Sequence, residues 1–450
     1  MKKGREIDIT IEKTEFPGNG TAHFEDNKIS VKGAIPGEKV KIKVTKAKHK
    51  KIDGEIIEII DPSPFRIEKK CPHFGNCGGC LIQELPYSKE LQLKKEGVIN
   101  LFKKNGIDIS DVEIEASPKE YEYRNKMEFN FGDLEKGGEL CLGMHPKGKG
   151  FSVMTTDNCC LVDADFRAIL KTTLDYFREK KLPFYRVLSH EGYLRNLVIR
   201  KADNTGEILV NLVTSSQIEL DLKEYVDKIL ELGLRGSLSG ILHTINDSLS
   251  DAVIADKIEV LYGRTYINEI ILGLNFKITP FSFFQTNSKG AEKLYSIVRD
   301  FIGDFKDKTV FDLYSGTGTI GQIVSQNAKK VVGIEIVEEA VKAANENTKI
   351  NNIENCTFIA GDVGKIVDSL SEKPDIIIID PPRPGISSEA VEKTSAFNPK
   401  EILYVSCNPK TLIENLKAFE EKGYFMKKIK LMDMFPHTVH VETVCLIERE

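Results

Sequence analysis

The sequence has no apolar run that approaches the roughly 20 residues needed to span a bilayer. Its basic first five residues are not followed by the apolar segment that a signal peptide requires. We therefore expect no membrane association and a cytoplasmic location. Internal repeats and low-complexity tracts are also absent from the 450 residues. A chain of this length and ordinary composition is expected to form about two to four globular domains.

Excess positive charge is also missing, because the formal net charge is -5. Nucleic-acid-binding proteins are often basic, so the total argues against such a partner, although the location of the charge matters more than its sum. One segment is strongly basic, and it allows two interpretations. It contacts phosphates from a barrel loop, or it is a solvated edge strand kept soluble by lysine. The segment contains Lys41, Lys43, Lys46, Lys48, Lys50 and Lys51.

Three regions differ in their pattern of apolar residues. Residues 1–61 contain short alternating segments separated by turns, which predicts a five-strand β-barrel of OB-like type. Residues 62–278 contain a cysteine-rich segment, a helix over roughly 88–105 and mixed strand and helix signals, which indicate an α+β domain. Residues 279–450 alternate apolar strands with amphipathic helices, which predicts a doubly wound, Rossmann-like α/β domain with a parallel sheet.

A cofactor site is predicted at the carboxyl ends of the parallel strands, where ligands of open α/β sheets bind. The first strand leads into a glycine-rich turn at 314–321, which lets a ligand approach the backbone. Glu335 ends the next strand, where a carboxylate can accept hydrogen bonds from ribose hydroxyls. Asp380 ends a third strand and is followed by two prolines. The hydroxyl-rich turn favours S-adenosylmethionine over a dinucleotide, and the alternative role of Asp380 is a helix N-cap.

Cys407 closes a further strand, at 402–405, and so lies at the same edge of the sheet. It is either a nucleophile, which would need activation because a free thiol is mostly protonated at pH 7, or a small buried hydrophobe. A candidate base, Glu442, follows in an extended segment and shares a face with His440. His440 and His437 either orient a substrate or have neutral structural roles.

These stretches resemble the RNA uracil-5-methyltransferase family, and they occur in that family's order. The N-terminal barrel resembles a TRAM domain, which is an RNA-binding module. The resemblance covers nearly the whole chain, and its combined motifs are highly specific. The matching stretches are 123–127, 283–287, 312–319, 380–383, 406–409 and 440–444.

The resemblance implies that Cys407 attacks carbon 6 of a uracil and that Glu442 later accepts the proton from carbon 5. The thiolate adduct is needed because carbon 5 of uracil is too weak a nucleophile to attack a sulfonium methyl directly. The resemblance also implies that the helix near 88–105 packs on the catalytic domain. The residues that it implies for contact with S-adenosylmethionine are Gln285, Tyr314, Glu335 and Asp380.

Nine cysteines in a reducing compartment do not predict a disulfide framework. Cys71, Cys77 and Cys80 form a C-x5-C-x2-C pattern, in which three thiolates are well placed to hold one inorganic centre. The family's 23S ribosomal RNA branch has this spacing, and the resemblance implies a 4Fe-4S cluster with Cys159 as the fourth ligand. Cys160 is the alternative fourth ligand, zinc is the alternative metal, and free thiols are the remaining possibility.

The activity expected is therefore methylation of uracil C5 in 23S ribosomal RNA, with no obligate protein partner. The same chemistry on the T-loop uridine of transfer RNA is a close alternative. An alternative of another class is a non-catalytic RNA-binding or assembly protein with a methyltransferase fold, against which the complete set of Asp380, Cys407 and Glu442 argues. A redox protein is a further alternative, although nothing in the expected chemistry needs electron transfer.

Overall fold

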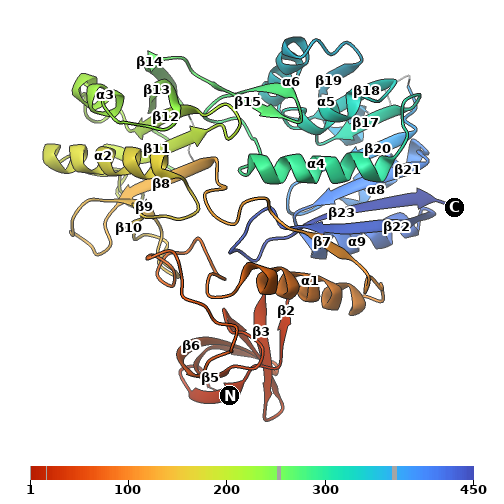
Figure 1. The fold of residues 1–450 in the computed structure, drawn as a ribbon, viewed down its shortest axis with the longest axis horizontal. Helices are drawn as coiled ribbons and strands as arrows, with labels where there is room; N and C mark the ends of the chain where they lie inside the picture. The colour runs from red at the N-terminus through yellow and green to blue at the C-terminus, as the bar shows by residue number, and fades with distance from the viewer. Residues whose placement is uncertain (1, 17, 251–254, 367–371) are drawn as a thin grey trace.

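The computed structural model of the chain describes residues 2–16, 18–250, 255–366 and 372–450. Three large sheets, of six, seven and eight strands, follow one another from the N-terminus (Figure 1). The predicted fold class is confirmed, with a β-barrel region at the N-terminus, an α+β middle region and a Rossmann-like C-terminal sheet. Within the described ranges, no helix is long and apolar enough to cross a membrane.

The N-terminal sheet has the strand order β1-β5-β6-β4-β3-β2, one strand more than the five expected. Val40, Ile42 and Val44 are buried on one face of β5, as their alternation predicts. Strand β3 escapes sequence prediction because Gly20 interrupts its pattern. The glycine is required there, since a Cβ would lie 2.7 Å from the carbonyl oxygen of Ala34. The strands are β1 (Glu6–Thr10), β2 (Lys13–Glu15), β3 (Asn19–Phe24), β4 (Asn27–Lys32), β5 (Lys39–Lys48) and β6 (Lys51–Asp61).

The middle region is built on a sheet of order β10-β9-β8-β11-β12-β13-β14, in which only β12 and β13 are parallel. Helices α2 (Ala164–Lys180) and α3 (Lys223–Leu230) bury Phe166, Ile169 and Tyr225 in its apolar core. The strands are β8 (Lys126–Gly132), β9 (Cys141–Met144), β10 (Met154–Thr155), β11 (Leu194–Lys201), β12 (Glu207–Thr214), β13 (Ser237–Ile245) and β14 (Lys257–Gly263).

The C-terminal sheet has the order β19-β18-β17-β20-β21-β23-β22-β7, and its five strands from β19 to β21 are parallel. Alternate residues of β20 enter two apolar cores, since Ile376 and Ile378 belong to one and Ile377 and Ile379 to the other. Its strands are β17 (Thr309–Leu313), β18 (Lys330–Glu335), β19 (Cys356–Ala360), β20 (Ile376–Ile379), β21 (Glu401–Ser406), β22 (Tyr424–Met432) and β23 (Glu442–Arg449). Its helices are α4 (Ser288–Ile302), α5 (Thr319–Ser325), α6 (Glu338–Ile350), α7 (Val363–Ile366), α8 (Ser388–Ala396) and α9 (Pro409–Glu420).

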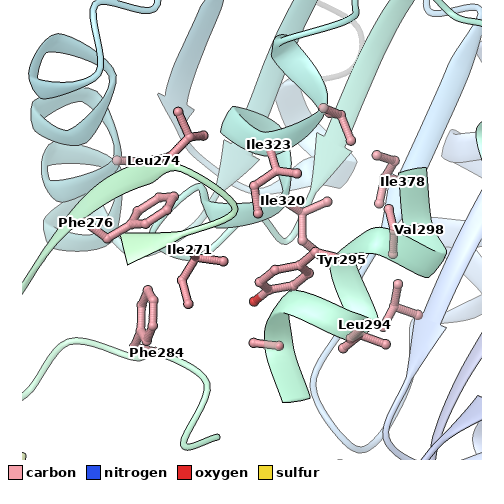
Figure 2. Close-up of a cluster of buried hydrophobic side chains, with 14 of the residues drawn as sticks. Ile271, Leu274, Phe276, Phe284, Leu294, Tyr295, Val298, Ile320, Ile323 and Ile378 are labelled. Carbon is pink, nitrogen blue, oxygen red and sulfur yellow. The ribbon is translucent and has the colours of Figure 1, made fainter. Parts of the chain in front are cut away.

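Segments that precede residue 279 also pack on this C-terminal layer. Helix α1 (Tyr87–Lys103) buries Val98 and Phe102 in the same core as Ile377, and β7 (Glu113–Glu115) pairs with β22. The hairpin of β15 (Ile267–Ile271) and β16 (Leu274–Ile278) packs on the other core, where Phe276 and Tyr295 are buried (Figure 2). The C-terminal domain therefore includes segments that precede the middle region in the sequence as well as segments that follow it.

Candidate active site

A glycine-rich turn joins β17 to α5 at the carboxyl edge of the C-terminal sheet. Its backbone has positive φ at Tyr314, Gly316 and Gly318, with values of 63°, 52° and 75°. A side chain at Gly318 would meet Phe358 at 2.5 Å, so the close approach of strand and helix requires a glycine there. Glu335 fixes the turn, because its carboxylate accepts hydrogen bonds from the N–H groups of Gly316 at 2.9 Å and Val337 at 3.0 Å.

A cavity of about 320 Å³ opens beside this turn, at the carboxyl ends of β17, β18 and β19. Tyr314 and Glu335 line it, as does Asp362, which follows β19. Asp362 was not among the predicted site residues. The signal that identifies it is its position after a parallel strand, which it shares with Glu335. Gln285 lies in the segment before α4, where Asn125 of the middle region donates a hydrogen bond to its carbonyl oxygen at 2.9 Å.

Carboxyl groups are concentrated at the ends of the central strands. Burial raises the pKa of Asp380 to about 7. Burial raises the pKa of Asp312, on β17, to about 8, and the nearby charge of Asp380 contributes. Burial and Asp380 also raise the pKa of Glu442 to about 8, against the opposing effect of Arg383. This concentration of acids favours a bound cation, which would relieve their mutual repulsion.

Cys407 and Glu442 lie opposite each other on neighbouring strands. Strands β21 and β23 are antiparallel, and their register pairs Ser406 with Thr443, so the next positions outward are Cys407 and Glu442. The predicted nucleophile and base therefore reach the same end of the sheet as Asp380. Glu442 is only 6% exposed, whereas Cys407 is half-buried. The roles predicted for them would require this proximity, because one group would attack and the other would remove a proton from the same ring.

The Cys407 thiol is protonated at neutral pH in the free protein. Burial, together with Glu442 and Asp380, raises its pKa to about 11, and Arg383 opposes the increase. Two features can stabilise a thiolate when it forms. Helix α9 begins two residues later, capped by Asn408, and directs the positive end of its dipole toward Cys407. Arg383 is the second, and the side chain of Asn408 holds its carbonyl oxygen at 3.1 Å.

Arg383 also determines the protonation of His440. The Arg383 guanidinium donates to His440 Nδ1 at 2.9 Å, and because an arginine only donates, Nδ1 must be the acceptor. Burial, Arg383 and Lys94 lower the pKa of His440, so the ring is neutral and its hydrogen lies on Nε2. Arg383 was not among the predicted site residues, although it stands in the predicted 380–383 motif. His437 has a different environment, because it is 1% exposed and its ring stacks on Tyr121 with centroids 4.3 Å apart.

The cysteines of the predicted inorganic centre gather between the middle region and the C-terminal domain. Cys71 and Cys80 are buried in one small apolar cluster, against which Cys159 and Cys160 pack. Burial, followed by Cys159, Cys71 and Cys77, raises the pKa of Cys80 to about 12. Two N–H groups point at sulfur, since Gly79 donates to Cys77 at 3.4 Å and Gln83 donates to Cys80 at 3.5 Å. Among the described residues, no group of three or more potential ligands has the arrangement that a single metal ion needs.

The N-terminal lysines divide between the two interpretations that the sequence allows. Register pairs three of them with acids on β6, namely Lys41 with Glu58, Lys43 with Glu55 and Lys46 with Asp53. These three are lysines of a charge-paired strand. The remaining three lie at the exposed turn between β5 and β6, where their charge is available to a phosphate backbone. They are Lys48, Lys50 and Lys51.

Comparisons with known proteins agree with this architecture. Residues 86–450 match the tRNA (uracil-5-)-methyltransferase family, and residues 1–57 match the TRAM domain. An uncharacterized RNA methyltransferase of Clostridium tetani is 59% identical, with 100% of this chain and 99% of the relative covered. Another, from Caldanaerobacter subterraneus, is 50% identical over the full length of both chains.

A solved structure is similar over 98% of this chain and 100% of its own, with a TM-score of 0.79 and 28% sequence identity. It is the tRNA (uracil-54, C5)-methyltransferase of Pyrococcus abyssi in complex with S-adenosyl-L-homocysteine. The expected resemblance to an RNA uracil-5-methyltransferase with a TRAM domain is confirmed, whereas its ribosomal RNA branch is not settled by these matches. The chain belongs to the tRNA (uracil-5-)-methyltransferase family, whose members are RNA methyltransferases, and it carries an N-terminal TRAM domain.

Proposed function

We propose that this protein methylates carbon 5 of a uracil in RNA through a covalent bond between the Cys407 sulfur and carbon 6 of the base. The observation that carries the proposal is the proximity of Cys407, Glu442 and Asp380, because Cys407 and Glu442 adjoin the paired residues Ser406 and Thr443 and the acids raise the pKa of the thiol. A nucleophile and a base that face one substrate ring are what the two halves of this reaction need.

S-adenosylmethionine is the proposed methyl donor, and it supplies an electrophilic methyl group on a positively charged sulfur. The site fits it, because a cavity lined by Tyr314 and Glu335 adjoins a set of buried acids that favours a cation. The residues proposed to hold it are Gln285, Tyr314, Glu335 and Asp380, to which the cavity adds Asp362. The similar enzyme of Pyrococcus abyssi was solved with S-adenosyl-L-homocysteine, which supports the choice.

The reaction begins when the Cys407 thiolate adds to carbon 6. The sulfur–carbon bond forms as the electrons of the ring double bond move toward the carbonyl at carbon 4, which gives an enolate. We propose that the Nε2–H of His440, whose Nδ1 accepts from Arg383, donates to a uracil carbonyl and so stabilises the developing negative charge. Carbon 5 would then take the methyl group from the donor, whose sulfur–methyl bond breaks to leave the neutral thioether S-adenosyl-L-homocysteine. Glu442 removes the remaining proton from carbon 5, the double bond re-forms and the thiolate leaves.

The RNA proposed is 23S ribosomal RNA, because the Cys71, Cys77 and Cys80 spacing is the one that the family resemblance connects with the ribosomal branch. A second candidate is the T-loop uridine of transfer RNA, since the similar Pyrococcus abyssi enzyme acts on uracil 54 of tRNA. The TRAM domain supports an RNA partner of either kind. Its exposed Lys48, Lys50 and Lys51 suit contacts with the phosphate backbone.

Deletion of the gene in its host tests the substrate. We expect 5-methyluridine to disappear from one or more positions of 23S ribosomal RNA and to remain in transfer RNA, as measured by mass spectrometry of nuclease fragments of each purified RNA. Loss confined to transfer RNA would overturn the ribosomal assignment and keep the chemistry. Unchanged 5-methyluridine in both RNAs would overturn the proposed activity.

We further propose that Cys71, Cys77, Cys80 and Cys159 hold a 4Fe-4S cluster. Cys71 and Cys80 are buried in one small apolar cluster against which Cys159 packs, so three of the proposed ligands lie near one another. The N–H groups that point at Cys77 and Cys80 are also typical of cluster ligands. We assign this centre a structural role and no step of the reaction.

The fourth ligand can be identified by a matched pair of variants. Cys159 is among the groups that raise the pKa of Cys80, and Cys71 and Cys77 raise the pKa of Cys159, whereas the pKa of Cys160 is raised by its charge interaction and hydrogen bond with Cys71. Cys159→Ser should therefore lose most of the iron and acid-labile sulfide, and Cys160→Ser should keep about four irons per chain after anaerobic purification. The reverse result would assign Cys160, and zinc in the unaltered protein would exclude the iron–sulfur centre.

A further inference from the structure

The segment between β22 and β23 connects the middle region, the cysteine-rich segment and the candidate active site. It runs from Asp433 to Val441, includes His440 and leads directly into Glu442. It has little regular structure of its own, and His437 has a φ of 67°, which is unfavourable for a residue with a side chain. External contacts must therefore hold it in place, and we call residues 433–441 the base loop.

A buried lysine of α1 makes the central contact with the base loop. The Lys94 side chain is 2% exposed and lies between two carboxylates, at 2.8 Å from Glu90 and 2.8 Å from Asp433, both of which are 0% exposed. Its ammonium group also donates to the carbonyl oxygen of Phe435 at 3.2 Å. Removing one member of such a buried set leaves a charge without a partner, so the arrangement resists displacement.

Glu90 contacts the same loop through His437. One carboxylate oxygen accepts the backbone N–H of His437 at 2.6 Å, and the other lies 3.2 Å from its Nδ1. The carbonyl oxygen of His437 in turn accepts the N–H groups of Leu81 at 2.9 Å and Ile82 at 3.2 Å, directly after Cys80. Glu90 therefore stabilises the unfavourable backbone of His437, three residues before His440.

The neighbouring peptides of the base loop are held from two further directions. The Tyr123 hydroxyl of the middle region donates to the carbonyl oxygen of Pro436 at 3.0 Å. The Asn287 side chain, before α4, donates to the carbonyl oxygen of Met434 at 2.9 Å. Each carbonyl from 434 to 437 thus accepts a hydrogen bond from outside the loop, which is unusual for a connection between two strands.

We infer that Lys94 and Glu90 of α1 are positioning residues that hold the base loop so that His440 and Glu442 face the ring attacked by Cys407. The inference rests on the proposed function. Both side chains are assigned an indirect role, through their contacts with the base loop. They are not needed to anchor α1, because its apolar side already buries Val98 and Phe102 in the core. The nucleophile stands on a different element, at the end of β21, so a displaced base loop affects proton removal more than thiolate attack.

The test measures covalent protein–RNA adduct during turnover on ordinary uracil-containing RNA. In Lys94→Met, we expect turnover to fall by about 10²-fold, the loss that a displacement of roughly 1 Å can cause. The fraction of enzyme trapped as adduct should rise, while the KM for S-adenosylmethionine stays within twofold. Lys103→Met makes the same chemical change at an exposed position of α1 and should behave as the unaltered enzyme.

A second variant keeps the test decisive if Lys94→Met does not fold. In Glu90→Gln, the charges of Lys94 and Asp433 balance each other. We expect this variant to trap less adduct than Lys94→Met. Glu442→Gln, which removes the proposed base itself, is assayed alongside. If Glu442→Gln accumulates adduct but the folded Lys94→Met and Glu90→Gln variants do not, the positioning role is overturned and the proposed mechanism stands. Absence of adduct from Glu442→Gln overturns the mechanism on which that role rests.

Discussion

Replacing Cys407 with Ala should abolish methylation and the covalent protein–RNA adduct together. Without the thiolate, carbon 5 is not activated, so methyl transfer cannot proceed by the proposed route. Removal of a covalent nucleophile typically lowers the rate by on the order of 10⁴-fold or more. The measurement is transfer of labelled methyl groups to RNA, with adduct detected after denaturing electrophoresis on RNA that contains 5-fluorouracil, in which fluorine replaces the carbon 5 hydrogen and cannot be removed by a base.

Cys141→Ala provides the matched control, because Cys141 lies on β9 of the middle region, far along the chain from the proposed chemistry. It should methylate RNA and form adduct at the unaltered rate. Full activity of Cys407→Ala would falsify the proposed mechanism. RNA binding without methylation by the unaltered protein, under conditions where both substrates bind, would instead favour the non-catalytic assembly protein.

The thiol of Cys407 has to lose its proton before it can attack. The pKa of Cys407 is about 11 in the free protein, mainly because of burial and because Glu442 and Asp380 repel a second negative charge. A bound cation beside Asp380 would reduce this repulsion and lower the pKa of the thiol. We therefore expect the proposed attack to become favourable only after the methyl donor has bound.

Candidate site residues can be predicted from the sequence where an apolar strand is directly followed by a residue type that the expected chemistry needs. Strand β20 is a continuous apolar run, and β17 and β21 are mostly apolar, as is typical of buried parallel strands. A carboxylate or cysteine directly after such a run lies at the active edge, which is why Asp380 and Cys407 could be placed before the structure was known. The proximity of Cys407 and Glu442 depends on the register between the antiparallel strands β21 and β23. A local sequence pattern does not reveal this register.

Contacts over long sequence distances account for what the sequence does not reveal. The acceptor role of His440 Nδ1 depends on Arg383, 57 positions away, and the buried Glu90–Lys94 pair has the spacing of an ordinary exposed pair on a helix surface. Strand β3 lacks alternation because Gly20 packs where no side chain fits. In the basic segment, Lys41, Lys43 and Lys46 differ from the lysines of the β5–β6 turn because acids lie opposite them on β6. The sequence alone does not show this cross-strand register.

Replacing Glu442 with Gln should leave thiolate attack and methyl transfer possible but stop the reaction before release. Gln has nearly the same shape and cannot accept the proton from carbon 5, so the methylated ring remains bonded to Cys407. We expect turnover to fall by about 10²- to 10⁴-fold, the range for loss of a general base. Unlike Cys407→Ala, this variant should accumulate adduct on ordinary RNA, with the methyl group already present on the trapped base.

Glu448→Gln tests whether the effect belongs to the site, because Glu448 is on the same strand but at its far end. It should turn over normally and trap no adduct. A Glu442→Gln variant that methylates at the unaltered rate would assign the proton to another group. One that forms no adduct would place Glu442 in cofactor binding, which a raised KM for S-adenosylmethionine would reveal.

The pH dependence of turnover supplies an independent measure of Glu442. Its pKa of about 8 is raised mainly by burial, so the carboxyl is protonated below this pH and becomes a base above it. Where proton removal limits the rate, turnover should therefore increase as the pH rises through about 8. Glu442→Gln has no ionisable group at this position, so its residual rate of adduct release should not increase as the pH rises through about 8. If the same increase persists in this variant, the ionisation belongs to a different group.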